Sequence, residues 1–127
     1  RDWSSDVCSS DLTMRSRQVL YELRIYKAMP GRLPVLLQRF ENEVLPLWEH
    51  HGIRAVGFWT TLIGPSANVA LHYMVEWASL AEREQKWGAF VRDPKWHAIR
   101  DASEVDGPYV EEFSNSILTP TSFSRMK

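Results

Sequence analysis

The sequence predicts an α+β fold in which helices cover one face of a four-stranded antiparallel sheet. Four segments carry strand-favouring residues, at about 19–27, 54–63, 69–77 and 110–118. Two further segments carry apolar residues at helical spacing, at 33–48 and 80–99. The order is strand, helix, strand, strand, helix, strand, which is the split βαβ pattern of a ferredoxin-like sandwich.

The first strand and helix are separated by Met29-Pro30-Gly31, which breaks the alternating pattern. We expect the helix that follows to end at Gly52, where a left-handed residue is favourable. Pro46 lies deep in this helix and has no N–H to donate to Asn42. The helix is therefore predicted to kink or loosen before it ends.

The second strand contains the aromatic run Gly57–Gly64, and we expect it to be buried on both faces and to end in a turn. After the third strand, Ser79-Leu80-Ala81-Glu82 has the spacing of a capping box, which predicts the start of the second helix. Asp93-Pro94 interrupts that helix and can restart it, because aspartate caps helices and proline fits their first position.

Residues 2–12 resemble the translation of a sequencing adapter. We therefore expect a non-native or disordered segment over 1–13, a true start at Met14, and one domain over 17–123. Without the first segment the net charge changes from -1 to +1, and Cys8, the only cysteine, is lost. The domain is then expected to carry no thiol chemistry.

Composition and charge limit the class of protein. Hydrophobic residues make up 44% of the 127 residues, which is enough for the core of one domain. The near-neutral charge gives no positive field for nucleic acid, and no apolar run approaches the roughly 20 residues that span a bilayer. We expect a soluble cytoplasmic protein with no nucleic-acid partner and no membrane span, or a mitochondrial matrix protein if the source is eukaryotic.

Five short motifs follow one another along the chain. They are Tyr21-Glu22-Leu23-Arg24-Ile25-Tyr26, Gly57-Phe58-Trp59-Thr60-Thr61-Leu62-Ile63-Gly64, Ser79-Leu80-Ala81-Glu82-Arg83-Glu84, Asp93-Pro94-Lys95-Trp96 and Pro120-Thr121-Ser122-Phe123-Ser124. In this order and at these separations they resemble the NIPSNAP family over nearly the whole domain. The resemblance implies a dimeric α/β barrel, in which two ferredoxin-like subunits pair their sheets face to face. It implies little about chemistry, because the family is not tied to one established enzymatic activity.

A second copy is also expected on physical grounds, because one layer of helices covers only one face of a sheet. We expect the more apolar faces of the first and third strands to meet the helices, namely Tyr21, Leu23, Ile25, Leu71, Tyr73, Val75 and Trp77. The opposite face then carries a candidate ligand-binding site of six residues: Glu22, Arg24, Tyr26, Trp59, His72 and Glu76. An ion-pair network that fixes sheet register and dimer geometry is the alternative interpretation.

The function predicted from these residues is a homodimer that binds a small apolar or anionic ligand, or a partner protein. The alternative is what the resemblance to dimeric α/β barrels implies: a cofactor-independent monooxygenase- or isomerase-like enzyme, in which His72 is the general acid or base and Arg24 stabilises an enolate. Glu49-His50-His51 does not predict a metal site, because adjacent histidines point apart on a helix. We expect neither a metal ion nor a cofactor.

Overall fold

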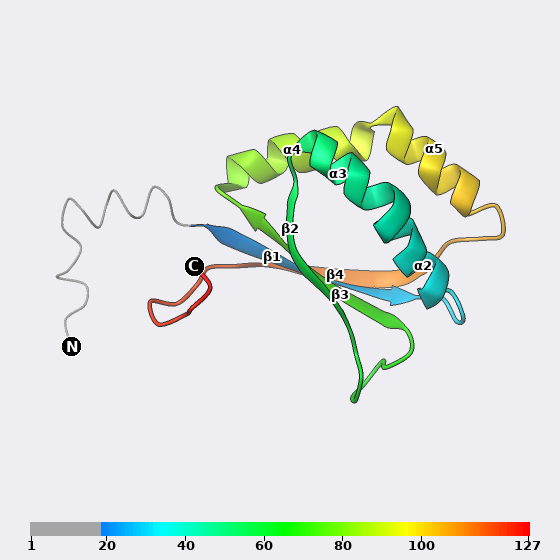
Figure 1. Cartoon of the computed structure of the whole chain (residues 1–127), viewed down its shortest axis with the longest axis horizontal. Helices are drawn as coiled ribbons and strands as arrows, with labels where there is room; N and C mark the ends of the chain where they lie inside the picture. Colours follow the sequence, from blue (N-terminus) through cyan, green and yellow to red (C-terminus); the bar gives the residue numbers. More distant parts are fainter. Residues whose placement is uncertain (1–18) are drawn as a thin grey trace.

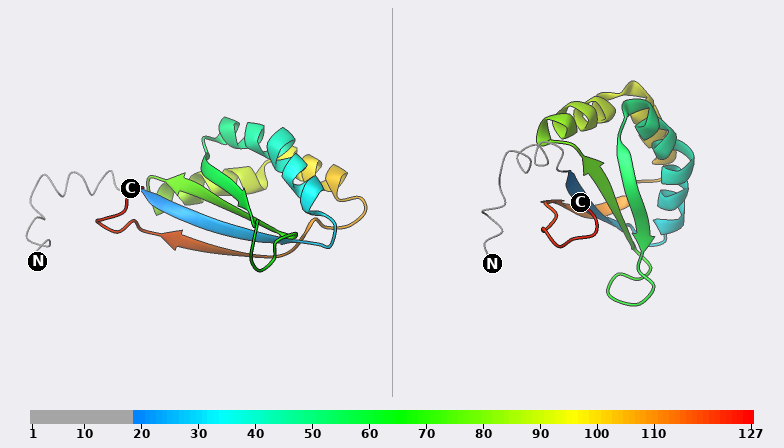
Figure 2. Two further views of the ribbon diagram at one scale, coloured as in Figure 1. Left: turned by 60° about the horizontal axis from the view of Figure 1, so that its bottom comes forward. Right: turned by 60° about the vertical axis from the view of Figure 1, so that its left-hand side comes forward.

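Within residues 19–127, the helices lie on one face of the sheet and leave the other face without a helix (Figure 1, Figure 2). The computed structural model describes residues 19–127, so the segment 1–13 lies outside the described residues. The strands are β1 (Leu20–Ala28), β2 (Arg54–Thr60), β3 (Ala70–Trp77) and β4 (Val110–Leu118). Their order in the sheet is β2-β3-β1-β4, and all neighbours are antiparallel. The predicted α+β class and four-stranded antiparallel sheet are confirmed.

The first helical region changes its hydrogen-bond pattern just before the internal proline. Helix α2 (Leu33–Arg39) continues into a π-helical turn, η1 (Phe40–Val44), and then into α3 (Leu45–His51). In η1 the N–H of Leu45 donates to the carbonyl of Phe40, which is the wider spacing of a π-helix. The next residue, Pro46, has no N–H for an ordinary helical bond. Helix α3 ends at Gly52 with a φ of 73°, so both predictions for this region are confirmed.

The second helical region has the caps that the sequence predicts. Ser79 precedes α4 (Leu80–Arg92), and its Oγ accepts from the N–H of Glu82 at 3.0 Å. The Glu82 carboxylate accepts from the N–H of Ala78 at 2.7 Å. Asp93 then ends α4 and starts α5 (Pro94–Ser103), because its Oδ1 accepts from the N–H of Lys95 at 2.8 Å.

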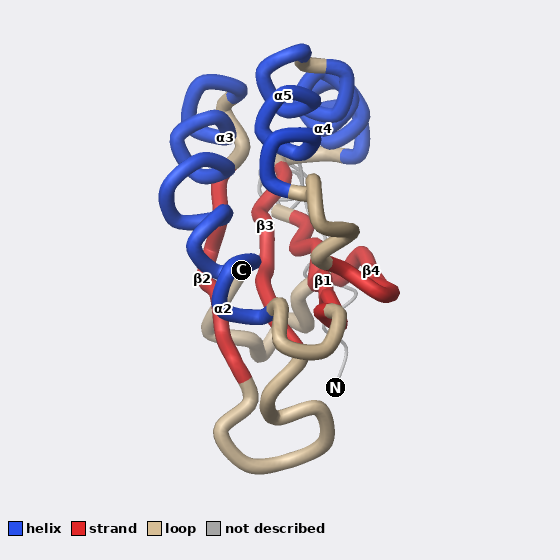
Figure 3. The backbone as a smooth tube through the Cα atoms, turned by 90° about the vertical axis from the view of Figure 1, so that its right-hand side faces the viewer, coloured by secondary structure: helices blue, strands red, loops and turns tan. Residues whose placement is uncertain are grey.

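Strand β2 differs from its prediction. It ends at Thr60 and lies at the edge of the sheet, where β3 is its one partner among the described strands. Trp59 is 50% exposed, and Leu62 and Ile63 are about nine-tenths exposed in the loop that extends beyond the sheet (Figure 3). The expectation of a strand buried on both faces is therefore wrong. Aromatic and β-branched residues favour strands in general, and they do not distinguish an edge strand from a central one.

The core fills the space between the sheet and the helices. Tyr73 and Trp77 of β3 are completely buried there, and Trp48 of α3 is only 2% exposed. The ring of Phe40 lies 5.3 Å from that of Tyr73 and 5.7 Å from that of Trp48. A polar group that is fully buried in this core needs a hydrogen-bond partner, because it has lost its contact with bulk water.

Candidate functional site

The antiparallel register of β1 and β3 decides which side chains share a face. Glu22 lies opposite Val75, and Arg24 lies opposite Tyr73, and directly opposite residues point to the same side of a sheet. Val75 and Tyr73 are buried against the helices, so Glu22 and Arg24 lie there too. The polar face of β1 therefore meets the helices, and the prediction that its apolar face does so is wrong.

The six predicted site residues divide between the two faces. Glu22, Arg24 and Tyr26 lie on the helix side. Trp59, His72 and Glu76 lie on the open side. The expectation that all six share one face is therefore wrong.

The proposed catalytic pair is divided in the same way. His72 lies opposite Ile25 of β1 and opposite Trp59 of β2, and its Nε2 is 3.1 Å from Oγ1 of Thr61. Arg24 lies on the helix side. The sheet therefore separates the two groups that the enzymatic hypothesis requires at one substrate.

Glu22 is completely buried and accepts five hydrogen bonds. Arg83 of α4 donates its Nε and Nη2, at 2.8 and 3.0 Å. The indole N–H of Trp77 donates at 3.0 Å, and Arg24 and Asn115 each donate at 2.9 Å. The carboxylate thus joins all three of its neighbouring elements, β3, β4 and α4, to β1.

These contacts keep Glu22 ionised. Burial raises the pKa of a carboxyl group, but here the hydrogen bonds from Arg83, Asn115, Trp77 and Arg24 outweigh it and lower the pKa of Glu22 to about 2. Glu22 therefore carries a full negative charge at neutral pH.

The guanidinium of Arg24 both donates hydrogen bonds and contacts aromatic rings. Its Nε donates to the hydroxyl of Tyr73 at 2.8 Å, and its Nη1 donates to Glu22 at 2.9 Å. Its Nη2 donates to the hydroxyl of Tyr26 at 3.2 Å. The guanidinium carbon also lies 4.7 Å from the ring of Trp87 and 5.2 Å from the ring of Phe113, which is within the range of cation–π attraction. Burial alone would lower the pKa of Arg24. Its interactions with Tyr73, Tyr26 and Glu22 raise the pKa by more than burial lowers it, so Arg24 stays cationic.

The charges in this cluster do not balance. Among the described residues, Glu22 is the single carboxylate that pairs with Arg24 and with Arg83. Within residues 19–127 neither arginine forms a second ion pair. Two cations therefore share one anion, and one positive charge is left over beside Trp87 and Phe113.

Two tyrosine hydroxyls extend the cluster from Arg24. The Tyr73 hydroxyl donates to that of Tyr26 at 2.8 Å. Burial raises the pKa of Tyr73 well above its usual value, so its phenol stays protonated. Tyr26 is half-buried, and the edge of its ring lies near Phe113 of β4. Tyr26 is thus the member of the pair that lies nearer the surface.

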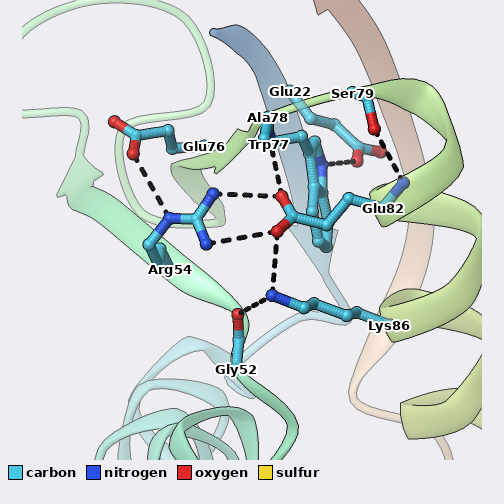
Figure 4. Close-up of polar contacts among 9 residues, drawn as sticks. All are labelled: Glu22, Gly52, Arg54, Glu76, Trp77, Ala78, Ser79, Glu82 and Lys86. Atoms are coloured by element: carbon cyan, nitrogen blue, oxygen red, sulfur yellow. Dashed lines mark hydrogen bonds and ion pairs between the residues drawn. The ribbon is translucent and has the colours of Figure 1, made fainter. Parts of the chain in front are cut away.

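A second polar network also fixes the first turns of α4, next to Arg83, and joins them to β2 (Figure 4). Glu82 accepts from Arg54 of β2 at 3.0 Å and from Lys86 at 2.8 Å, in addition to its bond to the N–H of Ala78. These bonds lower the pKa of Glu82 to about 2, with that from Arg54 having the largest effect. Arg54 is nearly half-exposed, so this network lies at the surface and its role is to hold α4 against β2.

Six residues of the cluster were not predicted as site residues from the sequence: Tyr73, Trp77, Arg83, Trp87, Phe113 and Asn115. A signal for Arg83 was present, because it lies four residues before Trp87 and therefore on the same side of the helix. A cation on the apolar side of a helix indicates a buried anion. Asn115 had no such signal, because its role depends on the pairing of β4 with β1.

Among residues 19–127, no group of three or more histidine, cysteine, aspartate or glutamate side chains is arranged to hold a metal ion. No helix in the described part of the chain is long and apolar enough to cross a membrane.

The fold and the cluster define a class of small α+β domain, in which a buried cationic and aromatic group lies between a helical layer and an antiparallel sheet. The chain belongs to the NIPSNAP family, whose model matches residues 21–125. None of the curated proteins compared matches it.

Solved structures of family members are similar to this chain. One is a NIPSNAP family protein of unknown function from Agrobacterium tumefaciens, with 25% identity and a TM-score of 0.75 over 87% of this chain and 96% of that one. A second protein of the family from the same organism has 28% identity and a TM-score of 0.74 over 86% and 99%. An uncharacterised NIPSNAP-like domain protein from Burkholderia xenovorans has 25% identity and a TM-score of 0.73 over 85% and 90%. The names of these relatives assign no activity to the family.

Proposed function

We propose that this protein binds a small ligand that combines an anionic group with an apolar part, and that the ligand lies between α4 and β4. The observation that carries the proposal is the surplus positive charge where Arg24 and Arg83 share Glu22. A cation in buried surroundings favours a nearby counter-charge, because charges there are screened poorly. An anionic ligand supplies that charge.

The aromatic groups around Arg24 support the apolar part of the ligand. Phe113 is 60% exposed although its ring lies against both Arg24 and Tyr26. Trp87 is half-buried, and its ring lies 4.7 Å from the guanidinium carbon. Ligand sites typically combine apolar walls with a few convergent polar groups, and the surroundings of Arg24 have both.

An ion-pair network without a ligand is the alternative for the same residues. Arg83 alone neutralises Glu22 and joins α4 to the sheet. A purely structural network has no need for the second charge on Arg24, and burying that charge carries a desolvation cost. The presence of Arg24 in addition to Arg83 therefore favours a ligand-binding site over a purely structural network.

We also propose that the protein is a homodimer that buries the open face of the sheet. This face carries Trp59, which is 50% exposed, and the half-buried Leu23, Ile25 and Met74. A contiguous apolar area of this kind favours association. The strand order fits a ferredoxin-like subunit, and two such sheets packed face to face make the dimeric α/β barrel that the family resemblance implies. A cytoplasmic location stays a prediction.

The monooxygenase- or isomerase-like alternative is not proposed. It requires His72 and Arg24 at one substrate, and they lie on opposite faces of the sheet within a protomer.

Native mass spectrometry of freshly purified protein tests the ligand proposal. We expect a bound small molecule on the wild type and none on Arg24→Met, which removes the guanidinium, keeps an unbranched apolar side chain and leaves Glu22 paired with Arg83. Arg54→Met is the matched control, because it removes an arginine from the other polar network and should keep the ligand. A wild type that carries no small molecule, or an Arg24→Met variant that keeps it, contradicts the proposal.

Size-exclusion chromatography with light scattering tests the dimer. The wild type should have the mass of two chains, and Trp59→Glu should have the mass of one, because it places a charge in the proposed interface. A wild type that stays monomeric at tens of micromolar contradicts this part of the proposal.

A further inference from the structure

We propose that the anionic group of the ligand is a carboxylate, and that Tyr26 and Arg24 bind it together. This inference rests on the proposed function and names the chemical class that the same site selects. It comes from the direction of the hydrogen bonds around the two tyrosine hydroxyls.

The hydroxyl of Tyr26 is the end of a chain of donors. Arg24 Nε donates to Tyr73, and the Tyr73 hydroxyl donates to Tyr26 at 2.8 Å. The Tyr26 oxygen also accepts from Arg24 Nη2 at 3.2 Å. With both of its acceptor positions in use, Tyr26 has its own O–H left to donate. No side chain or carbonyl within residues 19–127 accepts that proton.

Arg24 also has donors left. A guanidinium has five N–H groups, and three hydrogen bonds from Arg24 lie within residues 19–127. One N–H on Nη1 and one on Nη2 are therefore available. Arg24 is only 6% exposed, and an unused donor on a buried group is unfavourable unless a ligand or an ordered water accepts from it.

The two sets of donors are adjacent. Tyr26 Oη and Arg24 Nη2 lie 3.2 Å apart, so one planar group with two acceptor oxygens can accept from both. A carboxylate has this geometry and accepts readily from guanidinium and hydroxyl donors. A primary amide fits less well, because one of its two polar atoms is itself a donor and would face another donor.

The charge of the site distinguishes a carboxylate from a phosphate. One positive charge is in surplus around Glu22, and a carboxylate neutralises it. A phosphate or phosphonate dianion would leave a net negative charge near the buried Glu22, which is unfavourable in poorly screened surroundings. The site therefore favours a monoanion.

Calorimetric titration with three probes that share one apolar part tests the class of ligand. The probes are 3-phenylpropanoate, 3-phenylpropanamide and 2-phenylethylphosphonate. We expect wild-type protein to bind the carboxylate at least about tenfold more tightly than the amide, because the amide lacks the charge. It should also prefer the carboxylate to the phosphonate. Tighter binding of the phosphonate or the amide overturns the carboxylate assignment, and no saturable binding of any probe overturns the proposed function with it.

Variants then test the part of Tyr26. Tyr26→Phe removes the O–H and keeps the ring beside Phe113, so the carboxylate should bind about tenfold more weakly. Tyr109→Phe is the matched control, because the Tyr109 ring packs on Arg39 and its hydroxyl takes no part in the cluster. If Tyr26→Phe binds like the wild type while Arg24→Met does not bind, the role of Tyr26 is wrong and the proposed function stands. If neither Tyr26→Phe nor Arg24→Met changes binding, then the role of Tyr26 and the proposed function are both wrong.

Discussion

The side chain of Arg83 donates both its Nε and its Nη2 to the carboxylate of Glu22, at 2.8 and 3.0 Å, and so joins α4 to the inner strand β1. Glu22 is completely buried, whereas Arg83 is 28% exposed. The bidentate geometry is the strongest form of an arginine–carboxylate pair. The fold and the proposed site therefore depend on the same carboxylate.

Glu22→Gln should destabilise the protein strongly. The amide has nearly the same size, but it leaves Arg24 and Arg83 without their shared anion in a buried site. Removing one partner of a buried ion pair costs about 3–5 kcal/mol. Chemical unfolding monitored by tryptophan fluorescence measures the loss.

Glu82→Gln is the control for Glu22→Gln. Glu82 also pairs with two cations, but its main partner Arg54 is 45% exposed, and exposed pairs contribute about 0–1 kcal/mol. Equal losses in the two variants would contradict the importance given to Glu22.

The stability of the protein should fall as the pH drops from about 4.5 towards 2. The pKa values of Glu22 and Glu82 are lowered from 4.5 to about 2 in the folded protein. The unfolded chain therefore takes up protons at a pH where the folded chain does not, and stability is lost as the pH falls through this window. For the buried Glu22 the difference corresponds to about 3 kcal/mol at neutral pH.

Urea unfolding at about pH 7, 4.5 and 3 measures this dependence. Stability should change little between the first two values and fall between the last two. The fall should be smaller in Glu22→Gln. A fall of the same size in the variant would show that other groups cause it.

Two buried tryptophans should respond differently to the same substitution. Trp77 donates its indole N–H to Glu22 at 3.0 Å, whereas the indole N–H of Trp48 is buried and has no partner in the described part of the chain. Both substitutions to phenylalanine leave a cavity, but only Trp77→Phe also removes a hydrogen bond to a charged group, which contributes about 1.5–3 kcal/mol.

Thermal or urea unfolding of the two variants compares them directly. Trp77→Phe should be the less stable by about the value of that hydrogen bond. If Trp48→Phe is equally or more destabilised, then the bond between Trp77 and Glu22 contributes little.

The parts of the fold that depend on neighbouring residues could be predicted from the sequence. The capping residues Ser79 and Asp93, the left-handed Gly52 and the disturbance before Pro46 all act within one or two turns of a helix. Such signals depend only on local backbone geometry. The approximate position of each of the four strands also followed from the local pattern of residues.

The face of β1 could not be predicted, because it depends on partners that are distant in the sequence. The alternating pattern of β1 correctly predicted that Glu22 and Arg24 lie on the same face of the strand. Because this face is the more polar one, it was expected to point away from the helices. It points towards them because Arg83 and Trp77 provide Glu22 with hydrogen bonds that offset the cost of its burial. Half of the predicted site, Glu22, Arg24 and Tyr26, thus stays together, while Trp59, His72 and Glu76 belong to the open face.

The most direct measurement of the central claim is the dissociation constant of 3-phenylpropanoate for wild type, Arg24→Lys, Arg24→Met and Arg54→Met. Wild type and Arg54→Met should bind equally. Arg24→Lys should bind more weakly, because it keeps the charge and loses the planar donor fork. Arg24→Met should show no saturable binding. Equal dissociation constants for wild type and Arg24→Met would contradict an anion site at Arg24.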